Sequence, residues 1–560
     1  MPDYKTLIEE KLREQASLDA RMQVDADLAR HKAYVMTDLD KETLPNVINV
    51  TMNRPGVFAA NVLSALGGAS QQAVVESENR GVDTKKIEAF QTAAFAAANA
   101  MLRKQPGRDS LNVAADSHLC LRGRAARRVL FREEDGILIP EITPWDGRYV
   151  LYDTDGNGLA WAAYQNTRSK RQIETRYHVT IAGETGKVWD VWDREHNEVF
   201  VDAVRAFEEP HDYGEVPVVI QIVSLGYGSS MEDEGRIEHE GESIFFLIRR
   251  LIPEYNRLAS ILQTLNQKAA MPPIKETRLD GGDPTPYGEA MALMANTPLR
   301  PGEDIGPIDY GDAKRSAELL LNKLEQALQI GSVSDIDLGN PPFALSAVAL
   351  VALGEGKDQV FLPRLDAKAW LNQATAEMFT RQVIKIGGTV ELGIPGHKTK
   401  FNTHDLEGEY TTTYKYFTKS PTTDIARMSV AQTAKEFFSK EDVLKEILHV
   451  EDWKGVLRRK YSDMSEVVFP IVLQSRIIMS TYELAKQGDE DAEREVKLMT
   501  GSMRMTLAQI QAGQLPAPPE APKGTEPALS LLGKDGQVGG IPSSAQKANA
   551  LMLRAPEEEA

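Results

Sequence analysis

The chain has 560 residues, a length typical of three or four folding units, and 42% of them are apolar while 26% are charged. This composition is ordinary for a globular protein and argues against a collagen-like, wholly disordered or membrane-integral chain. The formal net charge of −18 disfavours binding to nucleic-acid phosphates through overall charge, although DNA could still slide past such a protein.

The cellular compartment of the protein is indicated by what the sequence lacks: a second cysteine, a membrane-spanning segment and an export signal. The single cysteine, Cys120, excludes an intrachain disulfide and a thiolate cluster. No uninterrupted apolar run reaches the roughly 18 to 20 residues that cross a bilayer, and the first fifteen residues lack the basic and apolar parts of an export signal. We therefore expect a protein of the reducing cytoplasm, with no membrane partner.

The first hundred residues are predicted to be largely helical. Apolar residues recur at three- and four-residue spacing over 4–35, and the alanine-rich stretch 87–102 contains neither Gly nor Pro. Asn53-Arg54-Pro55-Gly56 is expected to break the chain between helices.

Residues 122–223 are predicted to form an antiparallel β region. Short β-branched and aromatic runs, such as residues 149–152 and 198–201, alternate with turn sequences such as Asp155-Gly156, and 218–223 is expected to be the closing strand. Trp189 and Trp192 should lie on opposite faces of one strand, one in the core and the other in a packing or subunit contact.

Two long helices with a Pro- and Gly-rich excursion between them are predicted next. Helical spacing runs from Ile244 to Leu265 and ends at Met271-Pro272-Pro273, with a kink or break expected at Pro253. A second helix is predicted from Asp312 to Gly331.

The rest of the chain is expected to be mostly helical. It comprises a loop over 332–343, a helix-compatible stretch over 344–386, strand-like sequence over 389–417, helices over 425–511, and a Pro/Gly/Ser/Gln-rich disordered tail from 512.

Searches for catalytic and cofactor motifs yield near misses. Asp153 to Gly158 begins like a calcium loop, but Tyr164 stands where a bidentate Glu is needed, so a hairpin turn is favoured. Gly354 to Asp358 lacks two required residues of a phosphate loop, and His239-Glu240 lacks the second His of a zinc-protease helix. We therefore expect no enzymatic activity, no cofactor and no metal.

One stretch is densely basic, with five arginines at positions 122, 124, 127, 128 and 132. Two interpretations stay open: a phosphate-binding patch, or arginines that either form salt bridges to acidic neighbours or lie on a solvated face. The second is favoured in so acidic a chain.

The order of these segments resembles that of the portal proteins of tailed bacteriophages. The resemblance lies in the helical N-terminus, the β-rich stretch with Thr143-Pro144-Trp145-Asp146 and Tyr149, the segment 211–223, and the helix ending Lys268-Ala269-Ala270-Met271-Pro272-Pro273 before the excursion and return helix. It covers roughly residues 1–511 and consists of architecture and diffuse patterns rather than a short diagnostic motif.

The resemblance implies an α+β fold with the parts of a portal subunit. These are a wing (1–253, with its β region over 122–223), a stem helix (254–270), a clip (271–311), a second stem helix (312–331), a tunnel loop (332–343), a long helix with a return to the wing (344–424), a helical crown (425–511) and a disordered tail (512–560).

In function, the resemblance implies a ring, usually of twelve subunits, at one capsid vertex of a virion, assembled in the host cytoplasm. Double-stranded DNA would pass through it during packaging and ejection, while terminase, a head-tail adaptor and the major capsid or scaffold protein would dock on it. Catalysis belongs to terminase in that family. The alternatives are an oligomeric structural or scaffold protein without a DNA channel and, less favoured, an enzyme with a non-motif active site.

The candidate site residues follow from the same resemblance. The tunnel loop would place Asp335, Asp337 and Asn340 at the channel, where acidic side chains repel DNA phosphates. The stem candidates for the channel wall are Asn266, Lys268 and Lys323, and the clip candidates for partner binding are Arg278, Asp280 and Asp283.

Overall fold

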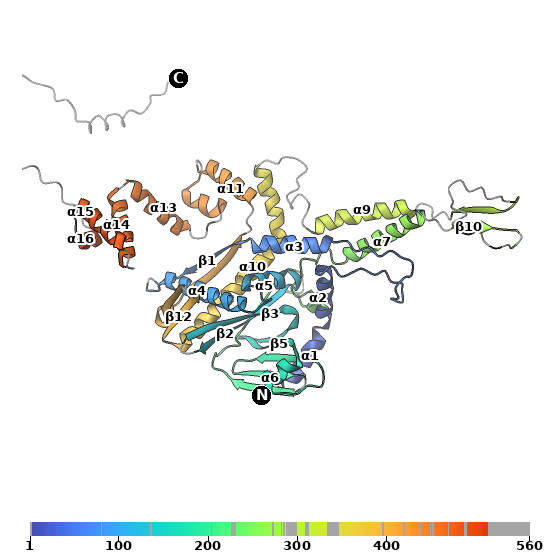
Figure 1. Ribbon diagram of the computed structural model, residues 1–560, viewed down its shortest axis with the longest axis horizontal. Coiled ribbons are helices and arrows are strands. Elements are labelled where there is room, and N and C mark those ends of the chain that lie inside the picture. The colour runs from blue at the N-terminus through green and yellow to red at the C-terminus, as the bar shows by residue number, and fades with distance from the viewer. Residues whose placement is uncertain are drawn as a thin grey trace, which may run out of the picture. The chain divides into compact units, whose positions relative to one another are not determined.

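Helices and antiparallel sheets alternate along the chain, which confirms the predicted α+β class (Figure 1). The computed structural model describes residues 3–79, 81–134, 137–202, 204–225, 231–270, 274–279, 281, 283, 286, 300–307, 313–332, 347–394, 397–417, 421–435, 438–448, 450, 453–468, 470–486, 490–503 and 505–512. Contacts divide the chain into two units between Trp453 and Lys454, and each unit is described by itself.

The first part of the chain is helical, as predicted, with one unexpected strand. Its elements are α1 (Tyr4–Glu14), α2 (Ala16–Ala29), α3 (Arg54–Gly67), β1 (Ser70–Glu76), α4 (Thr84–Arg103) and α5 (Leu111–Leu121). The predicted helical stretch to residue 35 is too long, since α2 ends at Ala29. The break predicted at 53–56 lies at the junction where α3 begins after a non-helical stretch, with Pro55 in the first turn, where a missing N–H costs no helical hydrogen bond.

The predicted β region is confirmed as two antiparallel sheets. Its elements are β2 (Arg124–Glu134), β3 (Ile137–Asp146), η1 (Gly147–Tyr149), β4 (Val150–Asp155), β5 (Gly158–Ser169), α6 (Lys170–Tyr177), β6 (Thr185–Trp192), β7 (His196–Val201), β8 (Val204–Pro210) and β9 (Val218–Ile222). One sheet has the order β3-β2-β9 and the other β4-β5-β6-β7-β8. The predicted closing strand is β9, and Asp155 to Gly158 forms the turn between β4 and β5 rather than a calcium loop.

The tryptophans of β6 lie on opposite faces of the strand, as predicted. Trp189 packs in a core with Tyr4 and Trp161, while Trp192 packs in another with Trp145. Each is only 7% exposed, so packing within the chain, and not a subunit contact, accounts for both.

The central part of the chain contains a helical hairpin and a 40-residue helix. Its elements are η3 (Arg236–His239), α7 (Leu251–Ala270), β10 (Ile274–Thr277), β11 (Asp304–Pro307), α9 (Ala313–Gly331) and α10 (Ala347–Ile386). Pro253 lies in the first turn of α7, so the helix starts where the break was predicted. Residues 354–358 lie within α10 rather than in a loop, which agrees with rejecting them as a phosphate loop.

The main core forms around α10, the yellow helix of Figure 1. Leu371, Phe379 and Val383 on this helix are fully buried, and Phe379 meets Phe90 of α4 edge-on at 5.9 Å. Cys120 of α5 is buried in the same core, and burial raises the pKa of its thiol to about 12, so the thiol stays protonated and unreactive.

The strands after α10 return to the N-terminal helices. They are β12 (Thr389–Ile394), β13 (His397–Asn402), η4 (Thr403–Leu406) and β14 (Thr411–Phe417). β14 pairs antiparallel with β1, from Ser70 opposite Phe417 to Glu76 opposite Thr411. This pairing closes the unit across more than 300 residues of sequence.

The helical character predicted for 425–511 is confirmed. The elements are α11 (Pro421–Ala434), α12 (Lys440–Asp442), the π-helical turn η5 (Val443–Ile447), α13 (Trp453–Val468), α14 (Pro470–Lys486), α15 (Glu490–Met503) and α16 (Leu507–Gln511). In the second unit, Ile478, Val496, Met505 and Ile510 form a small core. Residues 513–560, most of the predicted tail, lie outside the described residues.

Candidate functional site: the helical hairpin and its junction

The α7–α9 hairpin is rooted in the main core. The two helices run side by side (Figure 1), and Ile252, Tyr255 and Leu328 at their base are buried in that core. Gly331, the last residue of α9, packs against the turn that precedes α7. A Cβ added to this glycine would lie 2.8 Å from Cγ2 of Ile248. The base of the hairpin is therefore closely packed.

The hairpin ends in a short pair of strands. β10 and β11 pair antiparallel, with Ile274 opposite Pro307 and Thr277 opposite Asp304. Beside this pair, Nε of Arg278 donates to Oε1 of Glu276 at 2.8 Å. This pair occupies part of the segment predicted as a clip.

Apolar side chains are exposed on the outer face of α9. Leu319 is 58% exposed and Ile330 is 86% exposed. Eleven residues make about three helical turns, so these two side chains share one face, and Lys323 lies on it as well. An exposed apolar face on a helix that already packs its other side in the core suits contact with another protein surface.

An extended segment, residues 48–52, lies along α7. The backbone N–H groups of Ile48, Val50 and Met52 donate to Thr264 Oγ1 at 3.0 Å, Ser260 Oγ at 2.9 Å and Asn256 Oδ1 at 3.0 Å. Two residues of an extended chain span about 6.6 Å and four residues of helix about 6.0 Å, so every second amide meets every fourth side chain. The side chains of α7 thus fix this segment in one register.

Replacing Ser260 with alanine removes the middle contact of this segment. We expect the amide of Val50 to exchange with solvent about fivefold faster, because a hydrogen bond of this kind contributes roughly 1 kcal/mol. Hydrogen-exchange mass spectrometry on residues 48–52 measures this. The control is Ser316→Ala, an exposed position on α9, which should leave the exchange unchanged.

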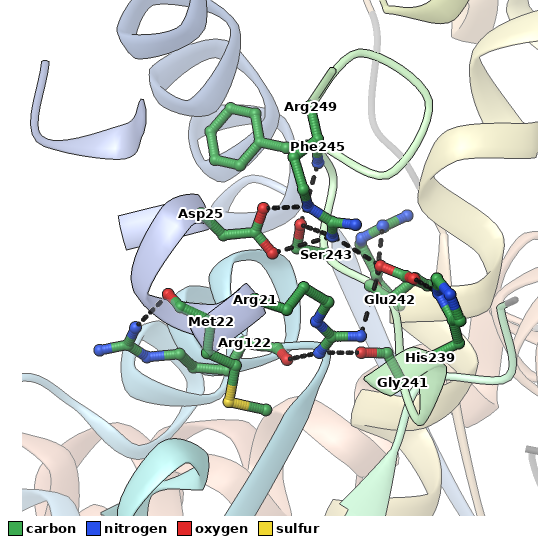
Figure 2. Close-up of polar contacts among 11 residues, drawn as sticks. Arg21, Met22, Asp25, Arg122, His239, Gly241, Glu242, Ser243, Phe245 and Arg249 are labelled. Carbon is green, nitrogen blue, oxygen red and sulfur yellow. Dashed lines mark hydrogen bonds and ion pairs between the residues drawn. The ribbon is translucent and has the colours of Figure 1, made fainter. Parts of the chain in front are cut away.

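A buried network of charges joins the start of the hairpin to α2 (Figure 2). Arg249 binds Asp25 through two hydrogen bonds of 2.6 and 3.0 Å and Oε2 of Glu242 at 2.6 Å. Arg21 Nη1 lies 3.3 Å from the same Glu242 oxygen, and His239 Nδ1 lies 2.7 Å from the other. Arg249 is two residues before α7, so the network fastens the root of the hairpin to the N-terminal helices.

The positive partners of Glu242 decide whether its buried carboxyl group is ionised. Asp25 and Glu242 are fully buried and Arg21 is 4% exposed. Burial acts to raise the pKa of Glu242, but the hydrogen bond from Arg249 and the charge of Arg21 outweigh it and leave the pKa below its ordinary value. Glu242 is therefore ionised at neutral pH, and its carboxylate faces the guanidiniums of Arg21 and Arg249.

This lowered pKa predicts how stability depends on pH. Because the folded pKa is depressed, stabilisation by ionised Glu242 is complete above the ordinary value of 4.5 and is lost as the pH falls through the folded pKa. The difference in unfolding free energy between the wild type and Glu242→Gln should be constant above about pH 5 and should shrink below it. Urea denaturation of both proteins between pH 3 and pH 7 tests this, and a difference that widens on acidification would contradict it.

The basic stretch over residues 122–132 contains buried and ion-paired arginines. Arg122 pairs with Asp146 at 3.0 Å, and Arg128 pairs with Glu141 and Asp190, each at 2.7 Å. The salt-bridge interpretation is therefore confirmed for these two. The solvated face is wrong for Arg124 and Arg127, which are each 1% exposed and donate to carbonyl and amide oxygens within the fold, as in the bond from Arg127 Nη2 to Leu111 O.

The three stem candidates, Asn266, Lys268 and Lys323, are all exposed. Successive helical residues are rotated by about 100° around the helix axis, so residues two positions apart differ by about 200°. Asn266 and Lys268 therefore lie on opposite sides of α7. At most one of them can line a common channel, while Lys323 shares its face with Leu319 and Ile330.

The remaining candidates are only partly covered by the structure. Arg278 and Asp283 are described, and Asp283 is exposed. Asp280 and the whole tunnel-loop set, Asp335, Asp337 and Asn340, lie outside the described residues.

Sequence reasoning missed the junction network and the segment along α7. Arg21 and Glu242 are 221 positions apart, and no local pattern connects them. The spacing Asn256, Ser260, Thr264, a polar stripe at four-residue intervals inside an apolar helix, was a signal that could have indicated a polar partner on α7.

Within the described parts of the chain, no helix is long and apolar enough to cross a membrane. The same residues contain no group of three or more His, Cys, Asp or Glu side chains placed to hold a metal ion.

No family model and no curated protein sequence matches the chain. Among solved structures, it is similar to a chain in the virion of a native gene transfer agent particle, at 12% identity and a TM-score of 0.37, covering 71% of this chain and 89% of that one. A chain in the neck of the empty particle, computed with C6 symmetry, has 12% identity, a TM-score of 0.38 and coverages of 70% and 89%. A chain in the neck of the native particle, computed with C12 symmetry, has 14% identity, a TM-score of 0.34 and coverages of 70% and 98%. At these TM-scores, the similarities establish neither a family nor a function for this chain.

Proposed function

We propose that the chain is the subunit of a portal ring, located at one capsid vertex of a virion, through which double-stranded DNA is packaged and ejected. The observation that carries the proposal is the α7–α9 hairpin: it is rooted in the core, ends in a strand pair, and exposes Leu319 and Ile330 on α9. An exposed apolar face of this kind is what repeated helix-to-helix contact around a ring requires.

The charge of the chain suits a conduit for DNA. A net charge of −18 disfavours tight binding to phosphates, and a wall that does not bind DNA lets it move. Lys323 shares the apolar face of α9, so in this proposal it belongs to the contact between subunits rather than to the channel wall. The tunnel-loop residues Asp335 and Asp337 remain the candidates for the narrowest part of the channel.

Two parts of the subunit have separate roles in this proposal. The β10–β11 strand pair, with Arg278 beside it and Asp283 in the segment that follows β10, is the surface on which terminase docks during packaging and a head-tail adaptor docks afterwards. The β region faces the capsid or scaffold protein. Assembly takes place in the host cytoplasm, and the subunit itself performs no catalysis.

The alternative is an oligomeric structural protein without a DNA channel, since the exposed face of α9 supports assembly of either kind. Electron-microscopy imaging of the purified assembly separates the two. Closed rings with a central opening wide enough for duplex DNA support the portal, while closed particles or filaments without an opening would overturn it.

A further inference from the structure

A cavity of about 380 Å³ lies between the two sheets of the β region. It is lined by β2 and β3 of the three-stranded sheet and by β5 and β6 of the five-stranded sheet, with the end of α4 and α6 beside them. This volume falls in the range of small-molecule binding sites, which is roughly 300–1,000 Å³.

The lining of the cavity is strongly basic, in contrast to the chain as a whole. Five arginines line it, at positions 108, 128, 132, 168 and 176. The carboxylates among the lining residues are Glu141 and Asp190, and both pair with Arg128 at 2.7 Å. Even without Arg132, the lining has four arginines and two carboxylates, an excess of two positive charges inside a protein whose net charge is −18.

Within the described part of the chain, two buried donors in this lining lack an acceptor. Among the described residues, no acceptor reaches Nε of Arg128 or Nε of Arg168, and both atoms are shielded from solvent. A buried N–H without a partner costs about 1–3 kcal/mol, so an acceptor brought by a ligand would relieve that cost. An anion with several acceptor oxygens would match both the positive charge of the lining and the two donors without an acceptor.

We propose that this cavity binds a compact multivalent oxyanion, of the class of inorganic pyrophosphate or the diphosphate of a nucleotide. Guanidinium groups bind phosphate oxygens through paired hydrogen bonds, and arginines from β5 and α6 approach the cavity from separate elements. Arg108, Arg132 and Arg176 are exposed, while the Nε atoms of Arg128 and Arg168 are shielded from solvent. This site is independent of the proposed DNA conduit and uses part of the basic stretch of β2.

Isothermal titration calorimetry of the full chain with pyrophosphate at low salt tests the proposal. Arg168→Gln and Arg176→Gln should each weaken binding about tenfold or more, because each removes a charge-assisted contact. Arg171→Gln is the matched control: it removes the same charge from an exposed position on the same helix as Arg176, but Arg171 does not line the cavity, so binding should change less than twofold. Arg176 is exposed, so its variant keeps the test valid even if Arg168→Gln fails to fold.

Titration with further ligands distinguishes a nucleotide from a free inorganic ion as the bound anion. Binding of ADP more tightly than pyrophosphate would indicate a nucleotide, and the reverse would indicate the free inorganic ion; either result supports the site. No heat of binding at millimolar pyrophosphate, an equal loss in Arg171→Gln, or tighter binding of a Glu-Glu-Glu peptide than of either phosphate ligand would overturn the proposal.

Discussion

Replacing Glu242 with alanine is expected to lower the free energy of unfolding of the first unit by about 3–5 kcal/mol. The carboxylate touches Arg249 at 2.6 Å and Arg21 at 3.3 Å, and its removal leaves both guanidiniums near a single carboxylate, Asp25. Removing one member of a buried charge pair has a cost of this size because the remaining charge stays desolvated. Equilibrium denaturation in urea measures the change.

Two further variants make this test specific. Glu254→Ala on α7 removes a carboxylate that lies 3.6 Å from Arg257 with both side chains more than half exposed, and it should cost less than about 1 kcal/mol. The double variant Arg21→Met/Glu242→Met leaves the pair of Arg249 and Asp25 in place, so its cost should be smaller than the sum of the two single substitutions. A cost for Glu242→Ala no larger than that of Glu254→Ala would show that the network does not stabilise the junction.

Placing glutamate at both Leu319 and Ile330 is expected to dissociate the assembly without unfolding the subunit. Each side chain is more than half exposed in the single chain, so the subunit should lose less than about 0.5 kcal/mol. In the assembly, each contact would lose the burial of two large apolar side chains, about 1.5–3 kcal/mol apiece, and would gain charges with no partner. Light scattering coupled to size-exclusion chromatography measures the mass.

The control for this prediction is Val204→Glu on β8, a position that is 57% exposed and lies away from the hairpin in sequence. That variant should assemble like the wild type. If Leu319→Glu/Ile330→Glu also assembles fully, then the outer face of α9 is not a subunit contact, and the observation that carries the proposed function is lost.

Local sequence patterns were sufficient for most helices and for the β region. The leucines of α9 recur at helical spacing, and the β4–β5 turn contains Asp155 and Gly156 in a sequence that favours a hairpin. Such features depend on neighbours within a few residues, so they can be read without the rest of the chain. β1 was missed because a seven-residue edge strand has little local signal, and its partner, β14, follows more than 300 residues later.

The sequence by itself determined the helical periods, the antiparallel hairpins, the acidic balance and the order of segments that resembles a portal subunit. The tertiary structure alone decided which charges are buried and what they meet: Glu242 lies against Arg21 and Arg249, and Arg168 lies beside a cavity. The physical reason is the range of the interactions. Periodicity and turn chemistry act over a few residues, whereas the cost of burying a charge is decided by partners that only the folded chain brings together.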